Sequence, residues 1–393
     1  MTATISRAVT EKAPLQELGF YALAAAPDNP RELLVEANEA ERIGFGSAFL
    51  SERFSVKESN TLAGALGVAT TRIGIATAAT NHHTRHPVIA ASHAMTMHKL
   101  TGGRYSFGIG RGAAQISRGL GLEPVTTAQM ADYVWILRRL WAGETVVDHD
   151  GPAGQFPRLS LGLSRPARIP LTLSAFGPKS LTLGGRLFDS IVLHSFLSDE
   201  ATKRAVETVR SAATQAGRDP SSIRIWSVLA TVGDHVSAEA QRRKLVGRLA
   251  TYLQGFGELL VEANQWNPGL LSRFRRDLFV RSFDGPIDGH ASNSELDHVA
   301  ELLPEEWLTP TAMGTAQECA STIRAQLELG VDGVVLHGGS PWELASTVDA
   351  YRVGRNDERF ARLDINPALV SRIRMASAGS PMAPTKSPVG SEI

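Results

Sequence analysis

The stretch Val331-Asp-Gly-Val-Val-Leu-His337 joins the end of a predicted helix to a run of branched apolar residues. Two other segments repeat this arrangement, Gly44-Phe-Gly-Ser-Ala-Phe-Leu50 and Leu187-Phe-Asp-Ser-Ile-Val-Leu-His194. A short polar pair followed by apolar residues suits a parallel strand that is covered on both faces. The recurrence therefore predicts repeated units in which a helix leads into a buried strand.

Strand-like and helix-like segments alternate along the whole chain, a pattern that places parallel strands inside and helices outside. We predict eight strands, the number that closes a barrel around layers of interior side chains, whereas an open doubly wound sheet more often has about five to seven. The sequence therefore predicts an α/β protein with the (β/α)₈ TIM-barrel fold. The predicted strands span residues 18–23, 46–51, 73–78, 104–110, 169–175, 189–195, 223–232 and 332–338.

Two regions interrupt the alternation and are predicted to be insertions. Residues 143–168, after the fourth strand, are rich in Gly and Pro, and residues 236–316, after the seventh strand, have little strand pattern. Residues 376–393 are rich in Pro, Ser and Gly, which predicts a disordered tail. We therefore expect a single barrel domain over residues 1–375.

Two helices have recognisable ends. For the first, Asn29 is predicted as the N-cap, Pro30 as the first helical residue, and Gly44 as the residue past the end. The second is predicted from Thr126 to Trp141, with a capping box between Thr126 and Gln129.

Composition narrows the class of partner. The 40 Lys and Arg residues balance the 40 Asp and Glu residues, so no charge excess points to nucleic acid. Cys319 is the only cysteine, as expected of a protein in a reducing cytoplasm. Residues 1–16 lack the apolar core of a signal peptide, and no apolar stretch approaches the roughly 20 residues that span a bilayer. We expect a cytoplasmic protein with a small-molecule substrate, no membrane and no nucleic acid, and outer barrel helices that can supply a homodimer face.

In a barrel of this kind the active site lies where the strands end, so the residues just past each strand carry the functional information. After the second strand come Glu52 and Arg53, an acid beside a base, whose plain alternative is a surface ion pair. After the third strand, residues 78–87 are dense in hydrogen-bonding side chains, which favours a recognition loop.

Three histidines in that loop raise the alternative of a metal site. His82, His83 and His86 match none of the standard zinc-ligand spacings, so no metal is predicted. They are interpreted as polar residues that line the wall of the site, or as side chains that hydrogen-bond backbone carbonyls.

Small residues follow the fourth and fifth strands. In Gly108-Ile-Gly110-Arg111-Gly112 the backbone can approach a ligand, and Arg111 could meet an anion. The spacing differs from the dinucleotide fingerprint, which disfavours a Rossmann domain. In Ser174-Ala-Phe-Gly-Pro-Lys-Ser180 the free amides at a helix start could hold a phosphate, with Lys179 adding a charge. His194 and His337 follow the sixth and eighth strands, at equivalent places.

Five stretches, in this order, resemble the luciferase-like flavin and deazaflavin oxidoreductases, over residues from about Leu18 to Tyr351. Their order makes the resemblance specific. The stretches are Ala40-Glu-Arg-Ile-Gly-Phe45, Ser51-Glu-Arg-Phe54, Ile75-Ala-Thr-Ala-Ala-Thr-Asn81, Gly102-Gly-Arg-Tyr-Ser-Phe-Gly-Ile-Gly-Arg-Gly112, and Gly314-Thr-Ala-Gln-Glu318 leading to Gly330-Val-Asp332.

The resemblance implies a cofactor ring lying across the strand ends, over a bulge after the third strand. In many members this bulge contains a non-prolyl cis peptide, which here would be Ala78–Ala79. The turn from Ala175 to Ser180 then looks like the cofactor-phosphate site. The residues expected to bind the cofactor are Ala78, Ala79, Thr80, Asn81, Gly110, Arg111, Gly112, Ala175, Phe176, Gly177, Pro178 and Lys179.

Arg53 stands where many FMN-dependent members have a histidine, so the resemblance favours the branch that uses the deazaflavin coenzyme F-420. A deazaflavin passes hydride and does not normally activate oxygen. Ring and substrate protonation are assigned to Glu52 or His194, and substrate contacts to Arg53, His82 and His337.

Three alternatives stay open: an FMN-dependent monooxygenase on the same barrel, a flavin-binding protein without catalysis, and a phosphate-sugar barrel enzyme without redox chemistry. The F-420 interpretation makes a geometric prediction. The loops near residues 52, 80, 111, 177 and 194 must converge at one rim of the barrel.

Overall fold

The computed structural model describes residues 11–24, 28–53 and 57–371. Eight parallel strands follow one another in the order β1-β2-β3-β5-β8-β9-β10-β12, and β12 pairs again with β1, so the barrel is closed. Each of the eight predicted strand regions overlaps one of these strands, which confirms the TIM barrel. Their bounds are β1 Leu15–Tyr21, β2 Phe45–Leu50, β3 Gly74–Thr77, β5 Tyr105–Gly110, β8 Leu171–Ser174, β9 Ser190–Val192, β10 Arg224–Gly233 and β12 Gly333–His337.

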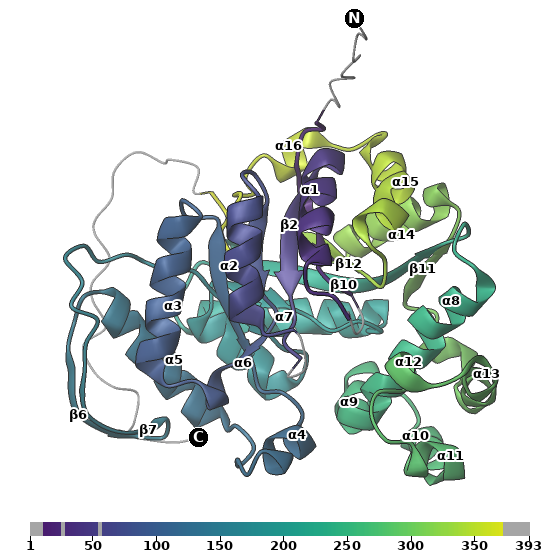
Figure 1. Ribbon diagram of the computed structural model, residues 1–393, viewed down its shortest axis with the longest axis horizontal. Helices are drawn as coiled ribbons and strands as arrows, with labels where there is room; N and C mark the ends of the chain where they lie inside the picture. Colours follow the sequence, from purple (N-terminus) through teal and green to yellow (C-terminus); the bar gives the residue numbers. More distant parts are fainter. Residues whose placement is uncertain (1–10, 25–27, 54–56, 372–393) are drawn as a thin grey trace, which may run out of the picture.

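Helices connect successive strands and cover the outside of the barrel (Figure 1). The helices of the outer layer are α1 Glu32–Ile43, α2 Ser59–Ala69, α3 Pro87–Leu100, α5 Thr127–Trp141, α6 Pro178–Leu187, α7 Asp199–Gln215, α14 Ala316–Glu328 and α15 Pro341–Arg352, followed by the short α16 Asp357–Phe360. The short α4 Ala114–Gly119 lies in the loop after β5.

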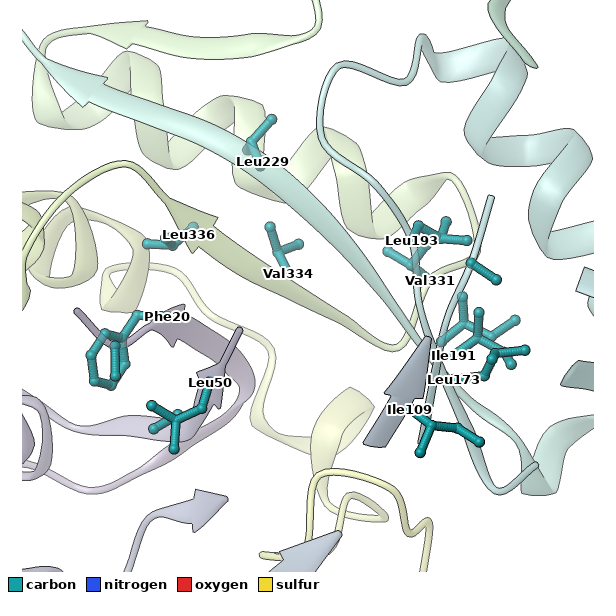
Figure 2. Packing of buried hydrophobic residues seen from close by; sticks show 14 of the residues in the cluster. Phe20, Leu50, Ile109, Leu173, Ile191, Leu193, Leu229, Val331, Val334 and Leu336 are labelled. Carbon is teal, nitrogen blue, oxygen red and sulfur yellow. The ribbon is translucent and has the colours of Figure 1, made fainter. Parts of the chain in front are cut away.

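The strands are buried on both faces, because successive side chains alternate between two apolar clusters. In β2, Phe49 belongs to a small inner cluster with Trp226, whereas Ala48 and Leu50 belong to the large cluster beneath the helices. Figure 2 shows part of the large cluster, in which Phe20 and Leu50 lie on neighbouring strands and Ile109, Leu173 and Ile191 come together from three consecutive strands. This burial explains why the strands are continuous apolar runs in the sequence.

Both insertions are present and lie on opposite sides of the view in Figure 1. The first forms an antiparallel hairpin, β6 Val146–Gly151 with β7 Gly154–Leu159. The second is mostly helical and also contributes β11 Thr311–Gly314, which extends the sheet beside β10. The sequence predicted neither the hairpin nor β11. The helices of the second insertion are α8 Ala238–Arg242, α9 Arg248–Asn264, α10 Pro268–Arg276, α11 Leu278–Ser282, α12 Ile287–His290 and α13 Asn293–Leu302.

A segment after the last helix closes the amino end of the barrel. The buried Arg224 guanidinium donates to the carbonyls of Asp364 and Asn366, each at 2.9 Å, and the Trp226 indole donates to the Pro367 carbonyl at 2.7 Å. The Asn366 amide in turn donates to the Tyr105 carbonyl at 2.9 Å. A ligand site therefore belongs at the opposite, carboxyl end of the strands. The predicted tail, residues 376–393, lies outside the described residues.

The predicted helix ends are confirmed with one correction. Thr126 and Gln129 form the capping box of α5, and Gly44 ends α1 in the left-handed conformation, with φ 89°. The predicted start is wrong, however: Asn29 is not the N-cap and Pro30 is not the first helical residue, because α1 begins at Glu32. The Asn29 side chain instead accepts from the Arg31 amide at 3.1 Å, in a turn that precedes the helix. No helix in the described ranges is long and apolar enough to span a bilayer.

Candidate active site

The bulge after β3 is organised by Glu52, which follows β2. One carboxylate oxygen of Glu52 accepts from the Thr80 hydroxyl at 2.6 Å and from the Asn81 amide at 2.7 Å. The other accepts from Arg85 at 2.8 Å, and the Glu52 side chain is only 6% exposed. The carboxylate therefore acts as a hub that holds the bulge in place. Within this bulge the Ala78–Ala79 peptide bond is cis, as the resemblance implied.

Backbone contacts continue from the bulge around the rim. β4, Thr80–Asn81, pairs with the end of β5, where Asn81 is in register with Gly110. A Cβ atom on Gly110 would lie 3.0 Å from the Ala79 Cβ and 3.7 Å from the Ser174 carbonyl oxygen, at the end of β8. Next along the rim, the rings of Phe176 and His194 lie 4.6 Å apart. The predicted convergence of the loops near residues 52, 80, 111, 177 and 194 is therefore confirmed.

One side of this rim consists of small residues, which we call the neutral arc. Gly112 has a positive φ of 69°, and a Cβ on Gly177 would lie 2.9 Å from a Leu259 methyl group. Helix α6 starts after Gly177 without a side-chain cap, so its first amides are free to bind an anion. The Ser174 hydroxyl is buried here without a hydrogen-bond partner among the described residues. The neutral arc comprises Ala78, Ala79, Gly110, Gly112, Ala175 and Gly177.

The two cations predicted beside the neutral arc differ in their surroundings. Arg111 donates to the Val125 carbonyl at 3.3 Å and to the Thr127 hydroxyl, and so ties the loop to the start of α5. Its Nε is buried without a partner among the described residues, so this N–H is available to a ligand. Lys179 and the preceding Pro178 are exposed at the start of α6.

The loop histidines separate from one another. His82 is buried, its ring lies 5.0 Å from that of Tyr133, and burial lowers its pKa to about 4. His86 packs at 5.3 Å against Phe156 of the hairpin. Across the ranges that the structure covers, no group of three or more His, Cys, Asp or Glu residues is arranged to hold a metal ion.

His194 lies two residues past the end of β9, which is shorter than predicted. Its Nδ1 bonds the Ser195 carbonyl at 3.0 Å, and a carbonyl can only accept, so Nδ1 carries the hydrogen. The Nε2 atom therefore keeps its lone pair. Aromatic rings surround the imidazole, with Tyr252 at 4.4 Å and Phe256 at 5.8 Å, and burial lowers its pKa to about 4.

Helix α9 of the second insertion crosses from β9 to β12. Tyr252 contacts His194 on one side, and its hydroxyl lies 3.4 Å from Nε2 of His337 on the other. One turn earlier, Arg248 lies 3.3 Å from the same Nε2 atom. Neither Arg248 nor Tyr252 was predicted as a site residue, because the sequence of an insertion does not reveal which barrel residues it will contact. Their spacing of four on one helix face was the only available signal.

The opposite side of the rim from the neutral arc is charged. Arg53 lies 3.9 Å from Asp288 of α12, and Arg248 lies 2.8 Å from the same carboxylate. Lys57 is fully buried and donates to the Leu23 carbonyl at 2.7 Å. Arg53, Lys57, Arg248 and His337 are called the cationic cluster below.

A closed barrel of parallel strands, whose carboxyl-end loops bring polar and charged side chains together, is the architecture of the (β/α)₈-barrel enzymes. The chain belongs to the luciferase-like monooxygenase family, whose model matches residues 14–333.

Relatives of this chain act on different substrates. It is 24% identical to the 5,10-methylenetetrahydromethanopterin reductase of Methanolobus tindarius over 330 residues, which covers 83% of this chain and 92% of that protein. Among solved structures, the coenzyme F-420-dependent tetrahydromethanopterin reductase of Methanopyrus kandleri matches with a TM-score of 0.69 and 19% identity, over 85% of this chain and 97% of that one. An F-420-dependent secondary alcohol dehydrogenase in complex with an F-420–acetone adduct matches with a TM-score of 0.65 and 20% identity, over 86% and 99% of the two chains. At these identities the structural likeness shows the shared fold.

Proposed function

We propose that this chain is an oxidoreductase that transfers hydride between coenzyme F-420 and a small organic substrate of the alcohol, ketone or enone type. The observation that carries the proposal is the neutral arc, a set of small residues at consecutive strand ends beside an uncapped helix start. Such a surface suits a flat heterocycle with a phosphate-bearing side chain. The two F-420-dependent proteins with the same fold support this choice of cofactor.

The residues at the neutral arc fit the cofactor in distinct ways. The Thr80 hydroxyl is engaged with Glu52, and the Asn81 side-chain oxygen accepts from the His83 amide at 3.0 Å, which leaves the Asn81 amide nitrogen to donate. We infer that Asn81 contacts the ring or ribityl chain, while the amides at the start of α6 and the exposed Lys179 hold the phosphate. When bound, a deazaflavin supplies hydride transfer without oxygen activation.

Of the two residues considered for proton transfer, the geometry favours His194. Both carboxylate oxygens of Glu52 already accept hydrogen bonds, from Thr80, Asn81 and Arg85, and this arrangement suits a positioning role. Oxidation of an alcohol releases a hydride from carbon and a proton from oxygen, and reduction of a ketone adds both. The lone pair on Nε2 of neutral His194 can accept that proton in the oxidative direction.

The test is a titration of the protein with oxidised F-420 and, separately, with FMN, followed by tryptophan fluorescence. The six tryptophans make a signal available. We expect F-420 to bind about tenfold tighter than FMN or better, and F-420 to be reduced when a secondary alcohol substrate is added. Preferential FMN binding together with oxygen consumption would instead identify a monooxygenase.

Two variants make the titration specific to the neutral arc. Gly110→Val adds a side chain next to Ala79 and Ser174, so it should weaken F-420 binding by about 100-fold. Gly119→Ala is the matched control, because nothing lies within 4 Å of a Cβ added there. Equal F-420 binding by the wild type and Gly110→Val would place the cofactor elsewhere.

A further inference from the structure

The cationic cluster contains a buried nitrogen that no described group satisfies. His337 is 7% exposed, and its Nε2 faces Arg248, which can only donate, so Nε2 accepts and Nδ1 carries the hydrogen. The Nδ1 atom is buried without a hydrogen-bond partner among the described residues. Buried donors are normally satisfied, so this one indicates an acceptor that is supplied by a ligand.

The charges around this donor do not balance. Arg53 and Arg248 share the carboxylate of Asp288, which also accepts from the Thr251 hydroxyl at 3.0 Å. The charges of Arg248, Lys57 and Arg53 each add to burial in holding the pKa of His337 well below its usual value. Arg248 contacts the neutral imidazole directly, and the charges of Lys57 and Arg53 act on it. Among the described residues, Asp288 is the carboxylate that pairs with the two arginines.

Lys57 has few partners for a buried ammonium group. It donates to the Leu23 carbonyl, while the Leu23 amide donates to Glu36 at 2.7 Å, so the Leu23 peptide separates the two charges. Burial, and then the charge of Arg53, lower the pKa of Lys57 to about 7, and Arg248 acts in the same direction while Glu36 opposes them. Lys57 would therefore gain from an anion placed beside it.

We propose that Arg53, Lys57 and Arg248 form an anion subsite around His337, so that the substrate carries a carboxylate near the carbon that exchanges hydride. The inference rests on the proposed function, because it assigns the substrate of the same site. Tyr252 contacts both His337 and His194. A carboxylate bound at His337 thus brings the neighbouring carbon toward His194, while the cofactor occupies the neutral arc.

The test measures binding of benzoate and of benzamide, two probes of similar size and different charge, by calorimetry on the full chain without cofactor. We expect benzoate to bind about tenfold tighter than benzamide. Its affinity should fall between pH 6 and pH 8.5, because Lys57 loses its proton in that range, whereas benzamide affinity should stay constant. Equal affinities for the two probes would overturn the proposal.

Arg53→Gln is the informative variant, since the Arg53 side chain is 27% exposed and its ion pair is long, at 3.9 Å. It should weaken benzoate binding by about fivefold and leave benzamide binding unchanged. Arg139→Gln is the matched control. Arg139 lies on the outer helix α5, its side chain is 37% exposed, and it pairs with Glu144. This variant should change neither benzoate binding nor benzamide binding. If both variants bind benzoate like the wild type, and thermal unfolding shows both folded, the cluster is not an anion subsite.

A second titration separates this proposal from the choice of cofactor. With F-420 bound, benzoate should still bind, because the two ligands occupy opposite sides of the rim. If F-420 displaces benzoate, the cationic cluster binds anionic groups of the cofactor and not of the substrate, and the proposal is overturned. Benzoate binding by a protein that does not bind F-420 would leave the subsite in place and reject the cofactor instead.

Discussion

The neutral arc and the cationic cluster face each other across one barrel rim, and they are built in different ways. The neutral arc consists of backbone and small side chains at the ends of β3, β5 and β8, supplied by short contiguous motifs. The cationic cluster joins Arg53, Lys57 and His337 to Arg248 of an insertion helix. A surface made of backbone and small side chains therefore follows from local sequence, whereas the opposing surface depends on how an insertion folds back on the barrel.

The largest expected effect is on proton transfer at the boundary between the two surfaces. His194→Gln should lower kcat by about 100-fold or more, because a positioned base contributes on that scale. The His194 pKa of about 4 means that wild-type activity should not lose this base as the pH falls from 7 to 5.

The control for this prediction is His86→Gln, an exposed histidine packed against Phe156 of the hairpin. Steady-state kinetics with F-420 and an alcohol substrate provide the measurement. A His194→Gln enzyme with unchanged kcat would remove His194 from the mechanism.

A second prediction concerns the hub beneath the neutral arc. Glu52→Gln leaves the half-buried Arg85 with only Glu58 as an acidic partner, so the free energy of unfolding should fall by about 2–3 kcal/mol. F-420 affinity should fall as well, because Glu52 orients Thr80 and Asn81.

Urea unfolding measures the change in stability. Glu39→Gln, which breaks a more exposed pair with Arg42, is the comparison variant and should cost less than about 1 kcal/mol. Similar losses in the two variants would mean that Glu52 is an ordinary surface carboxylate.

A third prediction uses the pH dependence of stability to probe the cationic cluster. Below pH 7 Lys57 is charged in both the folded and the unfolded protein, so the folded state bears the whole cost of burying that charge. Between pH 7 and the unfolded value near 10.5, the folded protein has lost the proton and the unfolded chain retains it, so stability rises with pH.

Lys57→Met removes this dependence. From pH 6 to pH 9 the wild type should gain about 2 kcal/mol of stability relative to the variant, as measured by denaturant unfolding at both pH values. A constant difference between the two proteins would show that Lys57 does not titrate in this range.

The smallest effect is expected at the edge of the neutral arc. Lys179 is exposed, so Lys179→Met should weaken F-420 binding by only about threefold, and less at high salt. Titration at low and high ionic strength measures this. A loss as large as that of Gly110→Val would mean that Lys179 is the main phosphate ligand.

The fold was predictable from the sequence because strands buried on both faces are continuous apolar runs, as in Val331–His337. The predicted ends of the strands were less accurate. β9 stops at Val192 because His194 turns into a cluster with Phe176 and Tyr252, a tertiary contact that no local pattern reveals. The hairpin β6–β7 was also missed, since Gly and Pro in that region indicated only a break in the alternation.

For the site, the short motifs identified loops that meet at one rim, and the contacts of each side chain then differ from one loop to the next. His82 and Arg111 are loop residues in the sequence, yet one packs against Tyr133 and the other is bonded to the start of α5. Lys57 and Arg248 were not predicted as site residues, because the sequence does not reveal their burial. The homodimer, the cytoplasmic location and the individual ligand contacts stay predictions.

The segment Asp364–Leu369 has a consequence for how the chain acquires its shape. It covers the amino end of the barrel, where its carbonyls accept hydrogen bonds from Arg224 and Trp226. Asn366 also donates a hydrogen bond to the start of β5. The ribosome makes this segment after every strand that it touches. During synthesis, the amino end of the barrel stays uncovered until residues about 140 positions downstream of Arg224 emerge, and a nascent chain that stalls earlier leaves this guanidinium without its carbonyl partners.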